Sequence, residues 1–565
     1  MKIGKMFAVA LCLAALGVRA ETGDLMPGVR NPLFWADVPD PSACTDGNYY
    51  YLVSTTMHLM PGCPVMRSKD LVHWETVSYV FDRIDDGGRY SLEDGKTVYG
   101  QGQWASSIRY ARGRFWVWFV ANGGRGFIYT AEKAEGPWKL HSRPEFRHDG
   151  SLFFDDDDRV YVFSGSGRIS ELKRDLSDFD PEGRDHLLFD KAADPEEADA
   201  LLEGSSVFKR DGWYYLMMIS MKWGVPGRIR REVCYRSRSL DDGNWEKKVI
   251  LETPFEAWGG VGQGTAVPSL DGSRYYAIIF QDRGGVGRVP CVMPIRFIDG
   301  WPMPGEKNAL EGERENCTGR IPNDTTVPYC DISGIMGSDN FDGAELSRYW
   351  QWNHNPDDAK WSLSERPGYL RLRTATVTDN LFLARNTLTE RMCGPECAGA
   401  VTLDVSGMRD GDRAGIAAFD GTSATLAVEM RSGRKSIVMC EETMVMGENR
   451  TVLRDDRREI ARVELSPEAL AAMKNTLVLR VRANFREAQD WAEVDYRDGH
   501  GEWRRIGSRV RLEFSVARMF MGAKFAVFNY ATEAPGGYVD LDSFSFTTVE
   551  HETPRWEPSA SAAAE

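Results

Sequence analysis

Short runs of aromatic and β-branched residues recur between Asn31 and Pro302, and a turn containing Gly or Asp precedes each of them. Long helical periodicity is nearly absent from this part of the chain. Repeats long enough for about four strands each, without helices, are typical of a β-propeller. The pattern predicts five blades, and a β-sandwich, or two of them, is the alternative that it leaves open. The five runs lie at 49–51, 115–118, 160–163, 213–216 and 275–278.

The pattern changes after Pro302. Residues 303–338 are rich in Gly, Pro, Asn and charged side chains, which is typical of a linker. Residues 339–550 show strand patterns again and predict a second all-β unit. Two domains agree with a length of 565 residues, which is too long for one ordinary core. We expect the final segment, 551–565, to be disordered.

The first 20 residues have the pattern of a secretory signal. Lys2 and Lys5 supply the positive start, an apolar run follows at 6–18, and Ala20 offers a cleavage site before Glu21. A short buried helix or anchor is the alternative, but the run is too short to span a bilayer. We therefore expect export to the periplasm or the cell exterior, and no transmembrane anchor.

Composition and charge narrow the choice of partner. The chain is 42% hydrophobic and 27% charged, as in soluble globular proteins, and its formal net charge is −15. An acidic surface disfavours nucleic acid and anionic membranes. Neutral sugars and small polar molecules remain as candidate ligands.

Nine cysteines remain once the first 20 residues are removed. An exported chain can form disulfides, and Cys44–Cys63 and Cys317–Cys330 are plausible pairs because each spans one hairpin or linker. The connectivity does not follow from the sequence, and an odd count leaves at least one thiol unpaired. No CxxC pair is present, so we do not expect a zinc site.

The acidic run at 155–158 could suggest calcium. It lies between two strand patterns, where a hairpin turn is required. We interpret it as a solvated turn.

Three carboxylates stand at the start of three different repeats, Asp40, Asp149 and Glu203. In a propeller the corresponding ends of the innermost strands converge on the axis, so these acids could meet at one mouth. Two prolines flank Asp40 and restrict its backbone, which suits a rigidly held general base. A turn bounded by prolines is the simpler interpretation of the same stretch.

These positions fall in motifs that resemble glycoside hydrolase family 43, in its β-xylosidase and α-L-arabinofuranosidase branch. The resemblance covers nearly all of the chain after the leader. It rests on Asn31-Pro32, Pro39-Asp40-Pro41-Ser42, Met60-Pro61-Gly62, Ser68-Lys69-Asp70-Leu71, His148-Asp149-Gly150-Ser151-Leu152-Phe153, Glu203-Gly204, and the stretch 281–288 with Asp299-Gly300-Trp301-Pro302.

The resemblance implies an all-β protein, a five-bladed β-propeller at 21–302 followed by a concanavalin-like β-sandwich. It implies that Asp40 is the general base, Glu203 the general acid, and Asp149 the residue that orients the acid and tunes its pKa. It also implies inversion at the anomeric carbon, for which the two catalytic carboxyls should lie about 6.5–9.5 Å apart.

The resemblance further implies substrate contacts for Arg288, Trp104, Gln263 and Met60. A surface ion pair for Arg288 and a core position for Trp104 are the alternatives. Gln263 stands where many members have an axial histidine, which puts an axial cation in doubt. The sequence also departs from the family beside the acids, at Ser106-Ser107, Gly150 and Ser205.

The second unit resembles the sandwich that follows the propeller in this branch, beginning at Asp339-Asn340-Phe341. In relatives this sandwich can close one side of the pocket. Asp342, Asp540 and Asp542 could hold a structural calcium ion, since calcium favours oxygen ligands, although turn acids are an equal alternative. We expect no cofactor to be required for catalysis.

The sequence therefore predicts an inverting exo-glycosidase that removes terminal β-D-xylosyl or α-L-arabinofuranosyl residues, or both, from hemicellulose oligosaccharides of xylan, arabinoxylan or arabinan. An endo-acting arabinanase and a non-catalytic carbohydrate-binding protein are the alternatives. Neither the preferred sugar nor an oligomeric state follows from the motifs.

Overall fold

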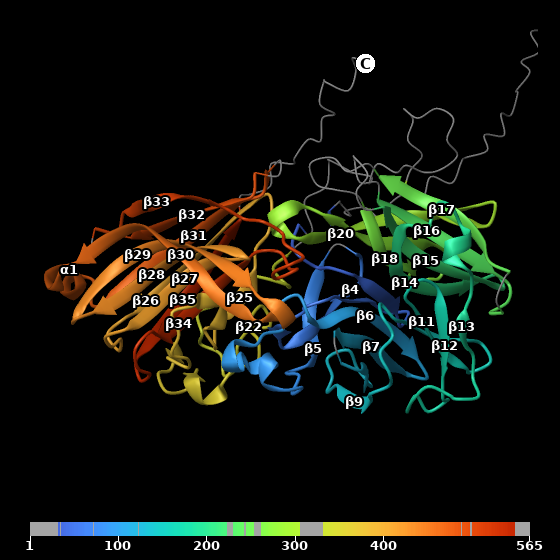
Figure 1. Cartoon of the computed structure of the whole chain (residues 1–565), viewed down its shortest axis with the longest axis horizontal. Coiled ribbons are helices and arrows are strands. Elements are labelled where there is room, and N and C mark those ends of the chain that lie inside the picture. Colours follow the sequence, from blue (N-terminus) through green and yellow to red (C-terminus); the bar gives the residue numbers. More distant parts are fainter. Residues whose placement is uncertain are drawn as a thin grey trace, which may run out of the picture.

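The structure is a computed structural model, and it describes residues 32–548 except 34, 72, 123, 223–229, 242–243, 254–260, 306–331, 487–488 and 498–499. Two β-rich units lie side by side, an N-terminal one in blue to green and a C-terminal one in yellow to red (Figure 1). The predicted leader and tail, most of the predicted linker, and Cys317 and Cys330 lie outside the described residues.

The N-terminal unit contains five four-stranded antiparallel sheets, which are the blades of a propeller. In chain order, blade 1 is β1-β2-β4-β5, blade 2 is β6–β9, blade 3 is β10–β13, blade 4 is β14–β17 and blade 5 is β18–β21. Their bounds are β1 (Ser42–Thr45), β2 (Tyr50–Val53), β4 (Gly62–Ser68), β5 (Trp74–Phe81), β6 (Gly102–Ala111), β7 (Arg114–Asn122), β8 (Gly126–Ala131), β9 (Lys139–Ser142), β10 (Ser151–Phe154), β11 (Val160–Ser164), β12 (Arg168–Leu172), β13 (Asp185–Leu187), β14 (Ala200–Arg210), β15 (Trp213–Lys222), β16 (Arg230–Ser237), β17 (Glu246–Thr253), β18 (Val261–Pro268), β19 (Tyr275–Asp282), β20 (Arg288–Ile298) and β21 (Trp301–Pro304).

The predicted five-bladed propeller is confirmed. Each predicted aromatic run falls in the second strand of a blade, where aromatic and β-branched side chains fill the space between neighbouring sheets. The first strands contact one another in the order β1, β6, β10, β14, β18, and β18 contacts β1 again. The ring is therefore closed, and the single-sandwich alternative for this unit is excluded.

The C-terminal unit is a sandwich of an eight-stranded and a seven-stranded sheet. The first contains β3 (Leu59–Met60), β22 (Gln351–Asn353), β25 (Leu388–Arg391), β34 (Lys524–Ala531), β27 (Asp412–Phe419), β28 (Thr422–Arg431), β29 (Arg434–Met446) and β30 (Val452–Leu465). The second contains β23 (Trp361–Ser362), β24 (Leu370–Arg373), β35 (Tyr538–Thr548), β26 (Glu396–Asp404), β31 (Thr476–Asn484), β32 (Trp491–Arg497) and β33 (Trp503–Arg511). The described helices are α1 (Pro467–Ala472) and the 3₁₀ turns η1 (Gly88–Ser91), η2 (Glu93–Gly95), η3 (Lys191–Ala193), η4 (Gly284–Val286), η5 (Asp358–Lys360), η6 (Leu381–Leu383) and η7 (Glu448–Arg450).

The two units share a sheet and a core. Strand β3 comes from the propeller part of the chain but pairs with β22 of the sandwich, through Met60 opposite Trp352. One continuous apolar cluster runs from blades 1 and 5 into the sandwich and includes Trp35, Ile278 and Leu388. An interface of this kind fixes the sandwich against the propeller.

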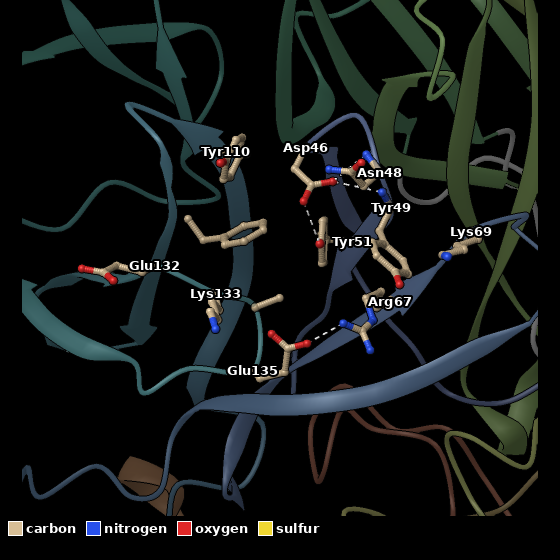
Figure 2. A pocket seen from close by; sticks show the side chains of 12 residues that line it. Asp46, Asn48, Tyr49, Tyr51, Arg67, Lys69, Tyr110, Glu132, Lys133 and Glu135 are labelled. Carbon is tan, nitrogen blue, oxygen red and sulfur yellow. Dashed lines mark hydrogen bonds and ion pairs between the residues drawn. The ribbon is translucent and has the colours of Figure 1, made fainter.

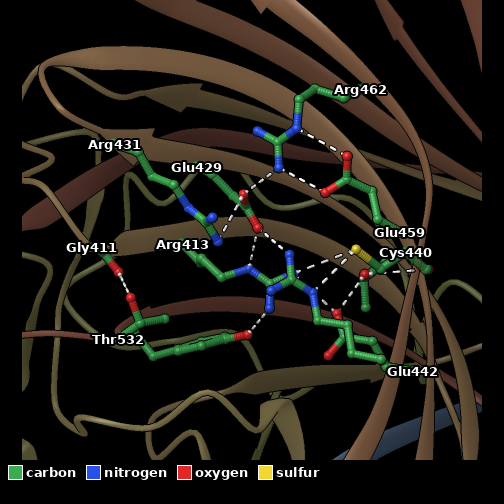
Figure 3. Close-up of polar contacts among 12 residues, drawn as sticks. Gly411, Arg413, Glu429, Arg431, Cys440, Glu442, Glu459, Arg462 and Thr532 are labelled. Carbon is green, nitrogen blue, oxygen red and sulfur yellow. Dashed lines mark hydrogen bonds and ion pairs between the residues drawn. The ribbon is translucent and has the colours of Figure 1, made fainter.

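A buried cluster of charged side chains lies on one face of the eight-stranded sheet (Figure 3). Ala414 and Ile416 belong to the apolar core, so alternation places Arg413 on the opposite face. The Arg413 guanidinium lies 3.0 Å from the Glu429 carboxylate and 3.1 Å from that of Glu442, and all three residues are buried. This face of the sandwich therefore holds paired charges beside a buried apolar cluster that includes Phe419 and Phe528.

Of the remaining sequence expectations, one is confirmed and one is not. The acidic run at 155–158 forms the β10–β11 turn, as predicted, with Asp158 N–H donating to the Asp155 carbonyl oxygen. Cys44 and Cys63 are buried free thiols, so that predicted disulfide is wrong. No helix in the described part of the chain is long and apolar enough to cross a membrane.

Candidate active site

Two of the three predicted acids occupy the same place in their blades. Asp40 lies two residues before β1 with φ of 51°, and Asp149 lies two residues before β10 with φ of 46°. A left-handed residue at the strand entry turns the side chain towards the axis, and Asp tolerates this conformation better than most residues. Both acids line one narrow axial cavity of about 20 Å³, together with Gln263.

Glu203 reaches the axis in another way, because it lies inside β14 at a β-bulge between Glu203 and Ser206. A bulge re-aims a side chain, and bulges are common beside active sites. Gly204 follows with φ of 71°, and a Cβ there would lie 2.5 Å from Gln263 Cγ. Only glycine fits at this position, which keeps Glu203 and Gln263 close together.

The Asp40 carboxylate is held on both oxygens. Thr55 Oγ1 donates to Oδ2 at 2.5 Å, and Arg288 Nη1 donates to Oδ1 at 2.9 Å. Burial raises the pKa of Asp40, and Arg288 and Thr55 oppose that rise by stabilising the carboxylate. The structure thus pairs Arg288, expected to contact substrate, with the predicted base.

Asp149 is buried among other charged groups. Burial raises the pKa of Asp149 to about 7; the Glu203 and Asp40 carboxylates add to this, and His148 opposes it. Gln263 Nε2 donates to Asp149 Oδ2 at 3.5 Å. The Gln263 backbone N–H is itself anchored by Glu232 Oε2 at 3.0 Å. Gln263 therefore contacts the predicted pKa-tuning acid.

Glu203 has a partner that the sequence reasoning missed. His148 Nε2 lies 3.0 Å from Glu203 Oε2 and 3.8 Å from Asp149 Oδ2. Burial acts to lower the pKa of His148, but its hydrogen bond to Glu203 and the surrounding carboxylates raise it to about 9. The available signal was its position directly before Asp149 in the same motif.

His148, Asp149 and Glu203 also form the one cluster of metal-ligand type in the described residues, with ligand atoms within 4.8 Å of one another. Two of its members are the predicted acid and the residue predicted to tune its pKa. We therefore interpret the cluster as a proton-handling site.

The predicted calcium ligands do not form such a cluster. Asp540 is buried and its carboxylate is neutralised by Arg371 at 2.7 Å and Arg366 at 3.0 Å. Asp342 and Asp542 are exposed, and Asp342 accepts a hydrogen bond from Asn340. The structure thus makes Asp540 an ion-pairing residue, and a bound calcium ion stays a prediction.

The two predicted apolar contacts differ in their surroundings. Trp104 lies at the bulge of β6, with its ring 5.5 Å from the His148 ring and 6.3 Å from the Phe520 ring. It therefore stands beside the acids, as expected of a pocket wall. Met60 is fully buried in the core of blades 1 and 2, and its backbone pairs with the sandwich. The structure gives Met60 a packing role.

The sandwich contributes directly to the surroundings of Asp40. Phe520 lies beside Trp104, its ring centre is 4.6 Å from the Arg288 guanidinium, and its carbonyl oxygen accepts from Arg288 Nη2 at 3.3 Å. Asp37 accepts hydrogen bonds from Arg288 N–H and Gly522 N–H, and pairs with Lys524 at 3.1 Å. Phe520, Gly522 and Lys524 of the second unit thus complete the surroundings of Asp40.

Three of the departures from the family pattern, Gly150, Ser106 and Ser107, have local explanations, and nothing in the structure explains Ser205. A Cβ at residue 150 would lie 2.2 Å from Trp118 Nε1, so Gly150 is required by packing. Ser106 accepts a hydrogen bond from Gln103 Nε2, and Ser107 accepts one from Leu152 N–H in the next blade. Ser107 therefore links blades 2 and 3, whereas this bond of Ser106 supports the bulge of its own strand.

A second cavity, of about 370 Å³, lies between blades 1 and 2, and none of the three acids lines it. Figure 2 shows two of its charged groups, Arg67 and Glu135, forming an ion pair, while Tyr51 donates a hydrogen bond to Asp46. It is separate from the candidate site.

Hydrolysis of a glycosidic bond requires two carboxyl groups in unlike surroundings. The propeller brings two such groups together, and we therefore place the protein among the glycoside hydrolases. Residues 29–302 match the family model described as Glycosyl hydrolases family 43. Residues 338–547 match the one described as Beta xylosidase C-terminal Concanavalin A-like domain. The chain belongs to glycoside hydrolase family 43.

Similar proteins span both units. A protein named Beta-xylosidase from Formosa agariphila is 27% identical over 91% of this chain and 90% of its own length. A Putative beta-xylosidase from Xylanibacter ruminicola is 31% identical over 67% of this chain and 68% of its own. A solved structure described as Bifunctional GH43-CE from Bacteroides eggerthii has a TM-score of 0.80 and 36% identity, covering 93% of this chain and 64% of that one.

Proposed function

We propose that the protein is an inverting exo-glycosidase that removes terminal β-D-xylosyl or α-L-arabinofuranosyl residues from hemicellulose oligosaccharides. The observation that carries this proposal is the contrast between the two acids. Asp40 is bound by a guanidinium and a hydroxyl, which stabilise a carboxylate, whereas Glu203 lies beside Asp149 and His148. Such unlike surroundings suit one base and one acid.

In this proposal the catalytic steps are as follows. Asp40 takes a proton from a water molecule that attacks the anomeric carbon, while Glu203 protonates the leaving oxygen on the other side of the sugar. Arg288 and Thr55 favour the ionised form of Asp40 and orient its carboxylate. Trp104 and Phe520 offer apolar faces for a sugar ring.

The names of similar proteins support this substrate class. Besides the two named for xylose, one is named Non-reducing end alpha-L-arabinofuranosidase, from Bacteroides ovatus, at 27% identity. The contact of Phe520 with Trp104 and Arg288 favours a pocket closed on one side over an open endo-acting cleft. All three acids are present, which disfavours a purely carbohydrate-binding protein. The leader-like residues 1–20 support export.

The test is side-by-side hydrolysis of 4-nitrophenyl β-D-xylopyranoside and α-L-arabinofuranoside, with NMR detection of the anomer formed first. We expect turnover of at least one and inversion at its anomeric carbon. Glu203→Ala should abolish hydrolysis of unactivated oligosaccharides and leave binding largely intact. Wild-type binding without turnover would favour the carbohydrate-binding alternative, and retention would refute the assigned steps.

Phe520→Ala should raise KM about tenfold, equivalent to about 1.4 kcal/mol, with a smaller change in kcat. The substitution removes the ring that contacts Trp104 but leaves both catalytic carboxyls in place. Steady-state kinetics of the two 4-nitrophenyl glycosides measure this effect. Phe514→Ala is the comparison variant, since its ring lies beside that of Phe520 but is farther from the Arg288 guanidinium, 5.9 Å against 4.6 Å. Equal effects of both variants would contradict the role of Phe520.

A further inference from the structure

His148 has no part in the steps assigned above, although it touches the acid. Its ring is held on two sides, edge to face by Trp104 with centroids 5.5 Å apart and by stacking on Phe146 at 6.3 Å. Its Nε2 atom points to Glu203 Oε2 at 3.0 Å. Two rings and a carboxylate thus fix the orientation of one partly exposed imidazole.

We propose that His148 is the positioning residue of the general acid, and this inference rests on the function proposed above. Its Nε2–H holds Oε2 of Glu203 and leaves Oε1 to protonate the leaving oxygen. A carboxyl on a bulged strand could otherwise rotate about its last torsion, because such terminal torsions are broad. Fixing one oxygen turns a flexible acid into an oriented one, which general acid catalysis requires.

The charges around His148 give it a second effect. Glu203 from β14, Asp149 from the entry to β10 and Asp40 from the entry to β1 all face it and favour its protonated form. The imidazolium in turn favours the ionised form of nearby carboxyls, as it does for Asp149. Loss of this positive charge should let the carboxyls keep their protons to higher pH. Both limbs of the pH–rate profile should then move to higher pH.

Two variants separate orientation from packing. His148→Phe keeps a ring between Trp104 and Phe146 but removes the N–H donor, and His148→Gln restores an N–H donor without a positive charge. Each is compared with wild type on a disaccharide, which needs full protonation of its leaving group, and on the 2,4-dinitrophenyl glycoside of the same sugar, which needs little.

We expect His148→Phe to lose about 10- to 100-fold in kcat/KM on the disaccharide and less than about threefold on the dinitrophenyl glycoside. His148→Gln should recover most of the disaccharide activity at its own optimum, with both limbs of its pH profile at higher pH than in wild type. Equal losses on the two substrates, or unmoved limbs in His148→Gln, would overturn the proposal.

The contact between His148 and Glu203 can also be tested without turnover, by titrating the His148 ring. NMR of ring-¹³C-labelled histidine, with His148 assigned by its absence in His148→Phe, should show His148 titrating near pH 9 in wild type. Glu203→Gln should lower that pKa by at least about one unit, since it removes the paired charge. An unchanged pKa would overturn the proposal. Absence of any hydrolysis by wild type would instead refute the proposed function.

Discussion

Replacing Asp40 with Asn is expected to lower kcat/KM by about 10³- to 10⁴-fold on every substrate that wild type hydrolyses. The amide keeps the shape of the side chain and its place beside Arg288, but it cannot accept a proton from water. Water must attack whatever the leaving group is, so the loss should be equal for disaccharides and dinitrophenyl glycosides. Steady-state kinetics with both substrate types measure this.

Asp156→Asn is the matched control for charge removal, because Asp156 is an exposed acid at the β10–β11 turn. Its kcat/KM should stay within about twofold of wild type. Residual activity of Asp40→Asn above about a tenth of wild type would show that another group takes the proton. A loss confined to poor leaving groups would instead make Asp40 part of the acid machinery.

The propeller could be predicted because its information is local. In each blade a turn is followed directly by an aromatic strand, and this pattern recurs along the chain. The three acids could be proposed for the same reason, since each precedes the aromatic run of its own repeat. His148 could have been found too, because it adjoins Asp149.

What escaped prediction depends on contacts between distant parts of the chain. The pairing of β3 with β22 brings Met60 to Trp352, and no local pattern separates such a strand from a loop. The ion pairs of Asp540 with Arg366 and Arg371 join strands far apart in sequence. The secondary-structure propensity of a charged residue does not predict which distant residue will pair with it.

Asp37 is where the two units and the site meet. Burial acts to raise its pKa, but Lys524, Arg288 and two backbone N–H groups hold the pKa of Asp37 below its usual range. Lys524 comes from the sandwich, Arg288 from blade 5, and Asp37 precedes Asp40 by three residues. One buried carboxylate therefore links domain docking to the residue that holds Asp40.

Asp37→Asn should lower the free energy of unfolding by about 3–5 kcal/mol at neutral pH, because it leaves the buried Lys524 without its counter-ion. It should also lower kcat/KM, since Arg288 loses the backbone anchor that Asp37 provides. Because the folded pKa of Asp37 is lowered, its ionisation contributes stability above the unfolded pKa. The difference from wild type should therefore shrink as the pH falls through the folded pKa.

Lys524→Met tests whether the pair acts as a unit. If it does, the double variant Asp37→Asn with Lys524→Met should be more stable than the sum of the single effects predicts, by about 1–3 kcal/mol. Urea unfolding followed by tryptophan fluorescence, with kcat/KM of each variant below its transition, measures both consequences. Strict additivity would mean that the two charges are stabilised independently, and that the sandwich does not support Asp40 through Asp37.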